Sequence, residues 1–156
     1  MFLGIDPGKS GGVAMVSKNR NTVFAVKMPA TEEGIARLFE EIGIENRPDA
    51  CYLEHVHAMP GQGVTSMFNF GANYGAIKTA LYAARIEFNI VTPVKWQKTV
   101  GLIFPSLTKT EKKNRHKKRA AELFPDVPRM TPDVHKVTHA IADALLIAEF
   151  CRMSES

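Results

Sequence analysis

The order of apolar segments along the 156-residue chain is the feature that most constrains its fold. Residues 2–5, 12–17 and 22–27 are short runs rich in apolar and β-branched side chains. Turn signals separate these runs: Asp-Pro-Gly follows the first, and a polar stretch at residues 18–21 follows the second. Such a pattern predicts three consecutive antiparallel strands.

Helical and strand patterns alternate in the rest of the chain. A helix is predicted to begin after Thr31, a favoured N-cap residue, with Glu32 and Glu33 in its first turn. The later segments, in chain order, are strand 50–54, loop 55–63, helix 64–84, strand 88–91, helix 94–100, a basic helix to about 124, loop 125–132 and a last helix from about 135 to 152. With the fifth strand parallel to the fourth, this order predicts an α/β fold, in which one domain over residues 1–156 has a mixed five-stranded sheet flanked by helices.

Basic residues are concentrated in one segment. The formal net charge is +4, and the stretch from Lys109 to Arg119 reads KTEKKNRHKKR, in which Glu111 is the only acidic residue. The remainder of the chain is close to neutral. One concentrated basic patch on a nearly neutral body is typical of a protein that binds a phosphate backbone. A solvated helix face or a localisation signal is the alternative interpretation.

Acidic residues occur at positions where a catalytic site could form. Asp6 ends the first strand, and Glu54 ends the fourth. Asp143 follows His139 by four residues on the last helix, so both lie on one helix face, about 6 Å apart along its axis. Asp143 is also embedded in the apolar stretch AIADALLIAEF, where a charge is costly unless it is paired or bound to a metal.

If the first and fourth strands are neighbours and the last helix packs across them, three carboxylates and one imidazole converge. Such a cluster repels itself without a cation, and its ligand types suit Mg²⁺ or Mn²⁺. Two such metals, about 3.5–4 Å apart, support phosphodiester hydrolysis. The alternatives are that Asp6 is only a turn residue, that Asp143 is a core carboxylate paired with Lys or Arg, and that His139 is an ordinary helix-face histidine.

Four segments, in this order, carry a family resemblance. They read GIDPGKSGGVAMV, YLEHVHAMPGQGVTSMFNFGANYG, VTPVKWQK and HAIADALLIA, and the match runs from about Phe2 to Phe150. The set resembles the RuvC-type Holliday junction resolvases of the RNase H-like superfamily, especially their shorter phage-like branch.

The resemblance implies an RNase H-like fold and a homodimer whose two active sites nick symmetric strands of a four-way DNA junction, leaving 5′-phosphate and 3′-hydroxyl ends. It implies a crossover junction endodeoxyribonuclease that uses Mg²⁺ or Mn²⁺, two ions per active site. The catalytic and metal-binding roles carry over to Asp6, Glu54 and Asp143, with His139 as the fourth ligand.

The chain departs from the family pattern at two positions. Cellular members have a carboxylate or histidine three residues before the final Asp, where this chain has Ala140 and instead places His139 one residue earlier. Cellular members also place a junction-probing aromatic three residues after the Glu of the fourth strand, where this chain has His57. A histidine can stack on a base, and Phe68 or Phe70 could take that role.

Several other residues are candidates for DNA binding or assembly. Trp96 is either a core or hinge anchor or a DNA contact. Gly71 and Gly75 allow close helix approach, for which packing logic favours the sheet and the resemblance favours a dimer axis. The residues expected to bind DNA are Lys9, His57, Lys109, Lys112, Lys113, Arg115, Lys117 and Lys118.

The sequence favours a cytoplasmic protein of a bacterium or of a phage-infected host cell. No apolar run is long enough to span a membrane, and the start MFLGIDPG lacks the basic region of a signal peptide. Cys51 and Cys151 are expected to be buried free thiols in a reducing compartment.

Two other function classes match parts of the sequence. GIDPGKSGG resembles the phosphate loop of actin-like sugar and acetate kinases, but 156 residues supply only one of the two domains that enclose ATP. The other class is a catalytically silent junction-binding module, for which a degenerate site would be the sign. None of the three acids is missing from this chain.

Overall fold

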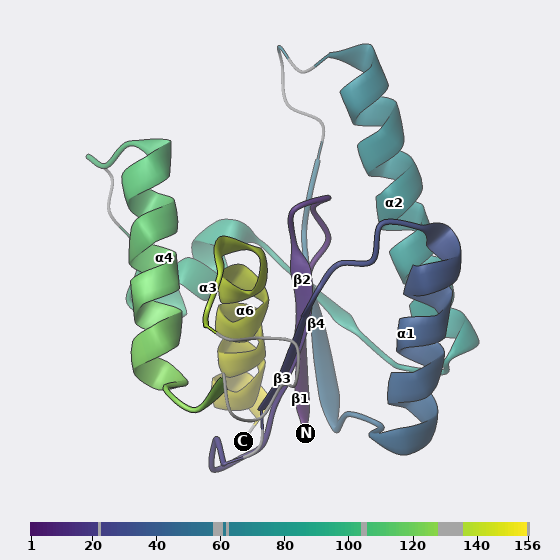
Figure 1. Ribbon diagram of the computed structural model, residues 1–156, viewed down its shortest axis with the longest axis horizontal. Helices are drawn as coiled ribbons and strands as arrows, with labels where there is room; N and C mark the ends of the chain where they lie inside the picture. The colour runs from purple at the N-terminus through teal and green to yellow at the C-terminus, as the bar shows by residue number, and fades with distance from the viewer. Residues whose placement is uncertain (22, 58–60, 62, 104–105, 128–135, 156) are drawn as a thin grey trace.

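A mixed five-stranded sheet forms the centre of the molecule (Figure 1). The computed structural model describes residues 1–21, 23–57, 61, 63–103, 106–127 and 136–155. The first three strands are antiparallel and β5 is parallel to β4, as predicted. The strand order is β3-β2-β1-β4-β5, and β1 also pairs parallel to β4. The strands are β1 Phe2–Asp6, β2 Gly12–Val16, β3 Val23–Lys27, β4 Ala50–Glu54 and β5 Asn89–Val91.

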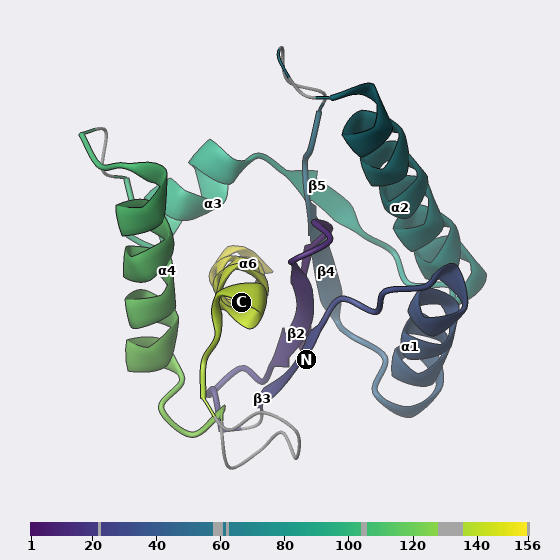
Figure 2. The same ribbon diagram turned by 45° about the horizontal axis from the view of Figure 1, so that its top comes forward.

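Helices cover both faces of this sheet (Figure 2). Two helices, α1 Glu32–Glu45 and α2 Val64–Ala83, pack on one face. On the other face lies α6 His139–Glu155, which contacts β1 and β2 most extensively. The remaining two, α3 Pro93–Thr99 and α4 Lys109–Leu123, pack on the side of α6 that faces away from the sheet.

The alternation of β1 explains why both faces are covered. Leu3 and Ile5 point into the core beneath α1 and α2, whereas Phe2 belongs to the core around α6. Gly4 lies against α6 so closely that an added Cβ atom would overlap the helix backbone at Ala148. The glycine therefore sets how near α6 can come to the sheet.

Most element boundaries agree with the local sequence signals. Thr31 caps α1 by accepting a hydrogen bond from the Gly34 N–H, and Thr108 forms a capping box with Glu111 at the start of α4. The last helix is the exception. Its predicted start at about residue 135 lies outside the described residues, but residues 136–138 are not helical and α6 runs from His139 to Glu155. The carbonyl of Thr138 accepts the first helical hydrogen bond, from Ala142 N–H.

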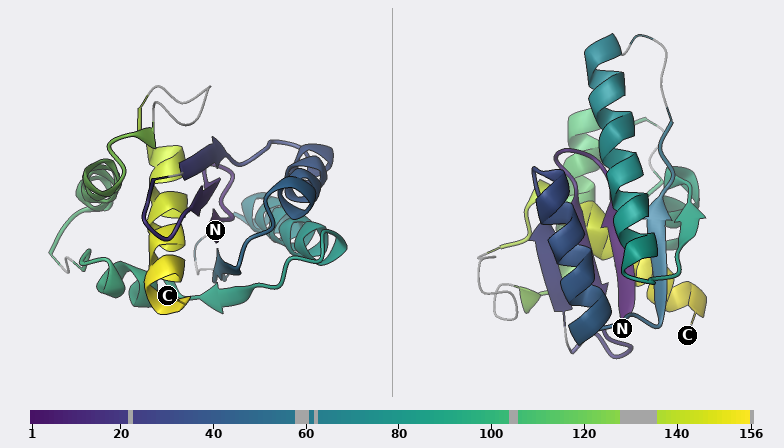
Figure 3. Two further views of the ribbon diagram at one scale, coloured as in Figure 1. Left: turned by 90° about the horizontal axis from the view of Figure 1, so that it is seen from below. Right: turned by 90° about the vertical axis from the view of Figure 1, so that its right-hand side faces the viewer.

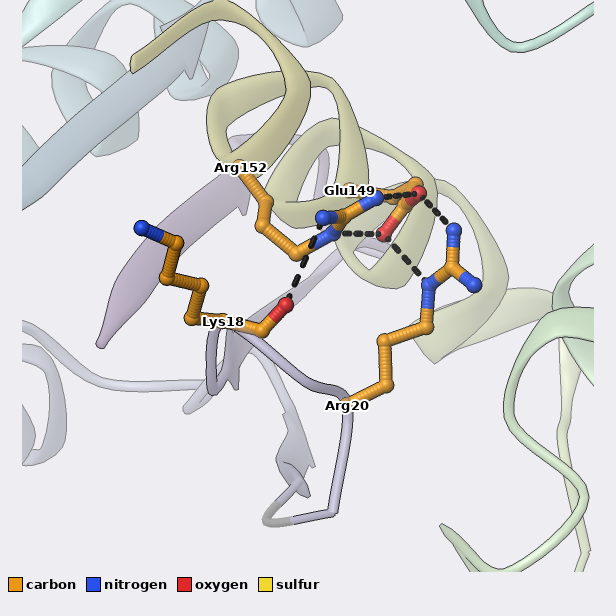
Figure 4. A network of polar contacts seen from close by, with 4 residues as sticks. All are labelled: Lys18, Arg20, Glu149 and Arg152. Carbon is orange, nitrogen blue, oxygen red and sulfur yellow. Dashed lines mark hydrogen bonds and ion pairs between the residues drawn. The ribbon is translucent and has the colours of Figure 1, made fainter. Parts of the chain in front are cut away.

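One buried charge ties α6 to the turn between β2 and β3 (Figure 4). Glu149 is 1% exposed, and its two carboxylate oxygens accept hydrogen bonds from the guanidinium groups of Arg20 and Arg152. Arg152 also donates to the carbonyl of Lys18. A buried carboxylate is tolerable only when it is paired in this way, so the network fixes the end of α6 that is remote from Asp143.

Of the two alternatives for the α2 glycines, close packing on the sheet is not what the structure shows. Apart from the adjoining residues and backbone of α2 itself, no described atom lies within 4 Å of a Cβ atom placed at Gly71 or Gly75. The N-terminal half of α2, which includes Gly71, rises beyond the sheet, as the right-hand view of Figure 3 shows.

Two other expectations concern the cysteines and the absence of a membrane span. Cys51 and Cys151 are free thiols, and both are buried, as predicted. Among the described residues, no helix is both long enough and apolar enough to cross a bilayer.

Candidate active site

Three carboxylates meet at one edge of the sheet. Asp6 and Glu54 end β1 and β4, which are parallel neighbours, so their carboxyl ends lie side by side. The first turn of α6 reaches the same edge, because Gly12 is so close to the Ala140 carbonyl that a Cβ atom there would overlap it. That approach brings Asp143, one turn into α6, to the strand ends.

The three carboxylates interact electrostatically. Burial and the charge of Asp143 raise the pKa of Asp6 to about 6, opposed by a hydrogen bond from the Gly8 N–H and by Lys113. Burial and the charge of Asp6 raise the pKa of Glu54 to about 8, with a smaller contribution from Asp143. Both shifts show that negative charge here is poorly compensated, which is the situation that a bound cation relieves.

A different group forms a hydrogen bond with each carboxylate. The Gly8 N–H donates to Oδ1 of Asp6 over 3.1 Å. The indole Nε1 of Trp96 donates to Oε1 of Glu54 over 2.8 Å, and Nδ1 of His116 lies 2.8 Å from Oδ1 of Asp143. Trp96 is fully buried, so its core-anchor interpretation is confirmed.

His116 is a site residue that the sequence analysis missed. Its side chain is buried on the inner side of α4, in line with the buried Ala120 and Phe124. This i, i+4, i+8 stripe in an otherwise charged helix is the signal that could have found it. Asp143 is therefore a paired carboxylate, but its partner is an imidazole and not the Lys or Arg that the alternative interpretation named.

The predicted fourth ligand, His139, is the first residue of α6 and is exposed. It lines a cleft of about 670 Å³ together with Asp6 and Asp143. The cleft also has a basic rim from three separate segments. The lysines of this rim are Lys9, Lys27 and Lys113. Lys27, which ends β3, was not among the predicted site residues.

The side chains present fit a divalent metal by their chemistry. Carboxylate oxygens with one imidazole form a donor set that suits Mg²⁺ or Mn²⁺, and the raised pKa values of Asp6 and Glu54 indicate unbalanced charge. Within the described parts of the chain, no three Asp, Glu, His or Cys side chains already lie in metal-ligating geometry.

The basic residues of α4 do not share one face. Lys109, Lys113 and Lys117 repeat every four residues and so form one stripe, from which Lys113 reaches the cleft. Arg115 and Lys118 line a separate groove with Glu111 and Leu107. The predicted patch is therefore divided between the cleft side of α4 and its opposite side.

The other predicted DNA contacts lie on the surface. Lys9, in the turn after β1, and Lys112, on α4, are both exposed. His57 is exposed beyond the end of β4, with its ring centroid 5.7 Å from that of His55. Phe68 is 75% exposed at the start of α2, whereas Phe70 is half-buried.

Comparison with known proteins identifies the architecture. The chain matches no protein-family model and no curated protein sequence. It is similar to the structure of Thermus thermophilus RuvC in complex with a Holliday junction substrate, with a TM-score of 0.61 and 17% identity over 95% of this chain and 89% of that one. The fold is RuvC-like. A second structure of Thermus thermophilus RuvC gives a TM-score of 0.59 and 18% identity over 95% of this chain and 90% of that one. At such identities the likeness shows the fold alone, an RNase H-like arrangement of a mixed sheet and flanking helices.

Proposed function

We propose that this protein is a structure-selective endodeoxyribonuclease that resolves Holliday junctions and related branched DNA by metal-dependent phosphodiester hydrolysis. The observation that carries the proposal is the convergence of Asp6, Glu54 and Asp143, with poorly compensated charge, at one sheet edge of a RuvC-like fold. One of the similar structures is a RuvC bound to a Holliday junction substrate, which supports branched DNA as the substrate class.

In this proposal Asp6, Glu54, Asp143 and His139 would hold Mg²⁺ or Mn²⁺, two ions per site. Such ions would supply the activation of water and the stabilisation of the leaving oxygen. The protein's own task is to aim the carboxylates at one place, and to bind the phosphates on either side of the bond that is cut. Lys9, on the rim of the cleft, is suited to bind a phosphate.

Longer-range DNA contacts would come from α4. The stripe of Lys109, Lys113 and Lys117 leads from the cleft along the helix, so one DNA arm would follow it. Contacts farther from the cleft would involve the remaining candidates. These are Lys112, Arg115, Lys118 and His57.

A homodimer would place two such sites on one four-way junction. The exposed side of α2 offers an apolar surface for a second copy of the chain. Its residues are Val64, Met67, Phe68, Gly71 and Gly75. Among the RuvC-type resolvases, we propose that the chain belongs to the phage-like branch. We propose the cytoplasm of a bacterium or of a phage-infected host cell as its place of action.

A cleavage assay on synthetic DNA tests the proposal. We expect the protein to nick a four-way junction when Mg²⁺ or Mn²⁺ is added and to leave a linear duplex of the same sequence intact. Cleavage should stop when EDTA removes the metal. Glu54→Gln should abolish cleavage, whereas Glu40→Gln, an exposed carboxylate on α1, should cut normally. Junction binding without cleavage by the wild-type protein at any metal concentration would identify a catalytically silent binding module instead.

A further inference from the structure

Trp96 and His116 form a buried aromatic pair behind the site. Trp96 is 0% and His116 is 7% exposed. Their ring centroids are 5.4 Å apart and the ring planes cross at 67°, an edge-on contact. The two residues come from α3 and α4, the helices that lie on the far side of α6 from the sheet (Figure 2).

Each ring of this pair contacts one carboxylate of the site. The indole N–H of Trp96 can only donate, and it donates to Oε1 of Glu54. A carboxylate that binds a cation is ionised and can only accept, so in that state Nδ1 of His116 would donate to Oδ1 of Asp143, from which it lies 2.8 Å. Two acids from opposite sides of the site, one on β4 and one on α6, are thus held by side chains that also contact each other.

The pair engages only half of each carboxylate. Among the described residues, no hydrogen bond reaches Oε2 of Glu54 or Oδ2 of Asp143. A buried indole N–H needs an acceptor, but any nearby backbone carbonyl would serve that structural purpose. Each ring instead contacts a carboxylate of the site, so the two rings constrain the orientation of these carboxylates.

We infer that Trp96 and His116 are positioning residues, which fix Glu54 and Asp143 so that their second oxygens are presented to a divalent cation. The inference rests on the proposed function for the role of that cation. Groups that hydrogen-bond to metal ligands typically change metal affinity by about 10- to 100-fold when they are removed. Trp96 and His116 should therefore control the affinity for the cation although neither would touch it.

Trp96 supplies its own reporter, because it is the only tryptophan in the chain. In a Mg²⁺ titration without DNA, the emission of wild-type Trp96 should change saturably, since its indole is hydrogen-bonded to Glu54. His116→Leu, which fills the space without a donor, should raise the Mg²⁺ midpoint by about 10- to 100-fold. His116→Asn, whose amide can replace the Nδ1 donor, should recover most of the affinity. Asn114→Leu, an exposed position on the same helix, is the matched control and should keep the wild-type midpoint.

Circular dichroism and thermal melting establish that each variant is folded. If His116→Leu does not fold, Trp96→Phe tests the same inference by calorimetry with Mg²⁺, and its affinity should fall by a similar factor because the N–H is lost.

A folded His116→Leu variant with the wild-type midpoint, or a wild-type protein that binds no Mg²⁺ by fluorescence and calorimetry, overturns the inference. The proposed function fails separately. If the wild-type protein cuts no junction but His116→Leu still weakens Mg²⁺ binding, the positioning role stands and the nuclease does not.

Discussion

At the scale of single residues, Asp6 and Glu54 show how a position at the end of a strand changes the pKa of a carboxylate. Each side chain stands at the last position of its strand, where it leaves the apolar core but remains shielded from water. Burial and the charge of Asp143 raise the pKa of Asp6 to about 6, and burial and the charge of Asp6 raise the pKa of Glu54 to about 8. The Gly8 N–H and the Trp96 indole oppose these shifts without cancelling them. The site therefore holds charge that the folded protein stabilises poorly in the absence of a cation.

This imbalance predicts how stability depends on pH when EDTA keeps metals away. The folded protein binds these two protons more tightly than the unfolded chain, whose ordinary pKa values are 3.8 and 4.5. The contribution of these two groups to the free energy of unfolding should therefore be greatest below both unfolded-state pKa values and should fall as the pH rises toward 8. Urea unfolding across this range should show a decrease of a few kcal/mol from these groups. Mg²⁺ added at pH 8 should restore stability, because the cation binds only the folded state.

Two variants separate this effect from the rest of the titration. Glu54→Gln should flatten the decline between pH 6 and 8, because Glu54 has the higher raised pKa. Glu40→Gln, on the exposed side of α1, should leave the decline unchanged. An equally steep decline in Glu54→Gln would contradict the assignment of the buried charge to this residue.

The site was only half predictable from the sequence. Asp6, Glu54 and Asp143 could be placed because each follows a local pattern, a strand end or an apolar helix. Their hydrogen-bond partners could not, because Trp96 lies 42 residues from Glu54 and His116 lies 27 residues from Asp143. Contacts over such separations depend on how α3 and α4 pack on α6, and local periodicity does not contain that information.

At the scale of elements, α6 determines whether the site can assemble. The helix is apolar on nearly all sides, since the sheet covers one side and α3 and α4 cover another. Its contact with β1 depends on Gly4, which leaves no space for a side chain between strand and helix backbone.

Gly4→Ala should destabilise the protein strongly. The added methyl would meet backbone atoms of α6 that cannot rotate away, so we expect a loss of about 3 kcal/mol or more in the free energy of unfolding, at the upper end for overpacked cores. Gly63→Ala is the control, because that position is open and its φ of −63° suits alanine, and it should change stability by less than about 1 kcal/mol. Equal urea midpoints for the two variants would show that α6 does not pack against β1 as described.

The boundaries of the elements follow the strength of their local signals. Thr31 is an N-cap followed by an acidic first turn, and α1 begins where that residue predicts. Thr108 caps α4 in the same way, with Glu111 in its first turn. The start of α6 was predicted too early because Val137 continues its apolar spacing upstream, while the helix begins only after Thr138. This difference puts His139 in the first turn, at the mouth of the cleft.

At the scale of the whole molecule, the distribution of charge matters more than its net value of +4. Lysines from the turn after β1, from β3 and from α4 surround the acidic cluster. A phosphate backbone could thus approach the carboxylates between positive charges, as the proposed reaction requires.

Lys113→Gln should weaken junction binding by a purely electrostatic route. Loss of one phosphate contact should lower the slope of log affinity against log salt by about 0.9, with little dependence on DNA sequence. Lys18→Gln, an exposed lysine in the turn between β2 and β3, should leave that slope unchanged. Fluorescence anisotropy of a labelled junction at several salt concentrations measures both, and an unchanged slope for Lys113→Gln would place the DNA elsewhere.

The most direct test of the central claim compares binding and cleavage in one variant. Asp6→Asn keeps the shape of the side chain but removes the charge at the centre of the acidic cluster. A Mg²⁺-dependent cleavage assay and a binding assay in EDTA, both on the same four-way junction, should show cleavage lost and binding retained relative to the wild-type protein. Retained cleavage by Asp6→Asn would contradict the claim that this cluster of carboxylates performs the reaction.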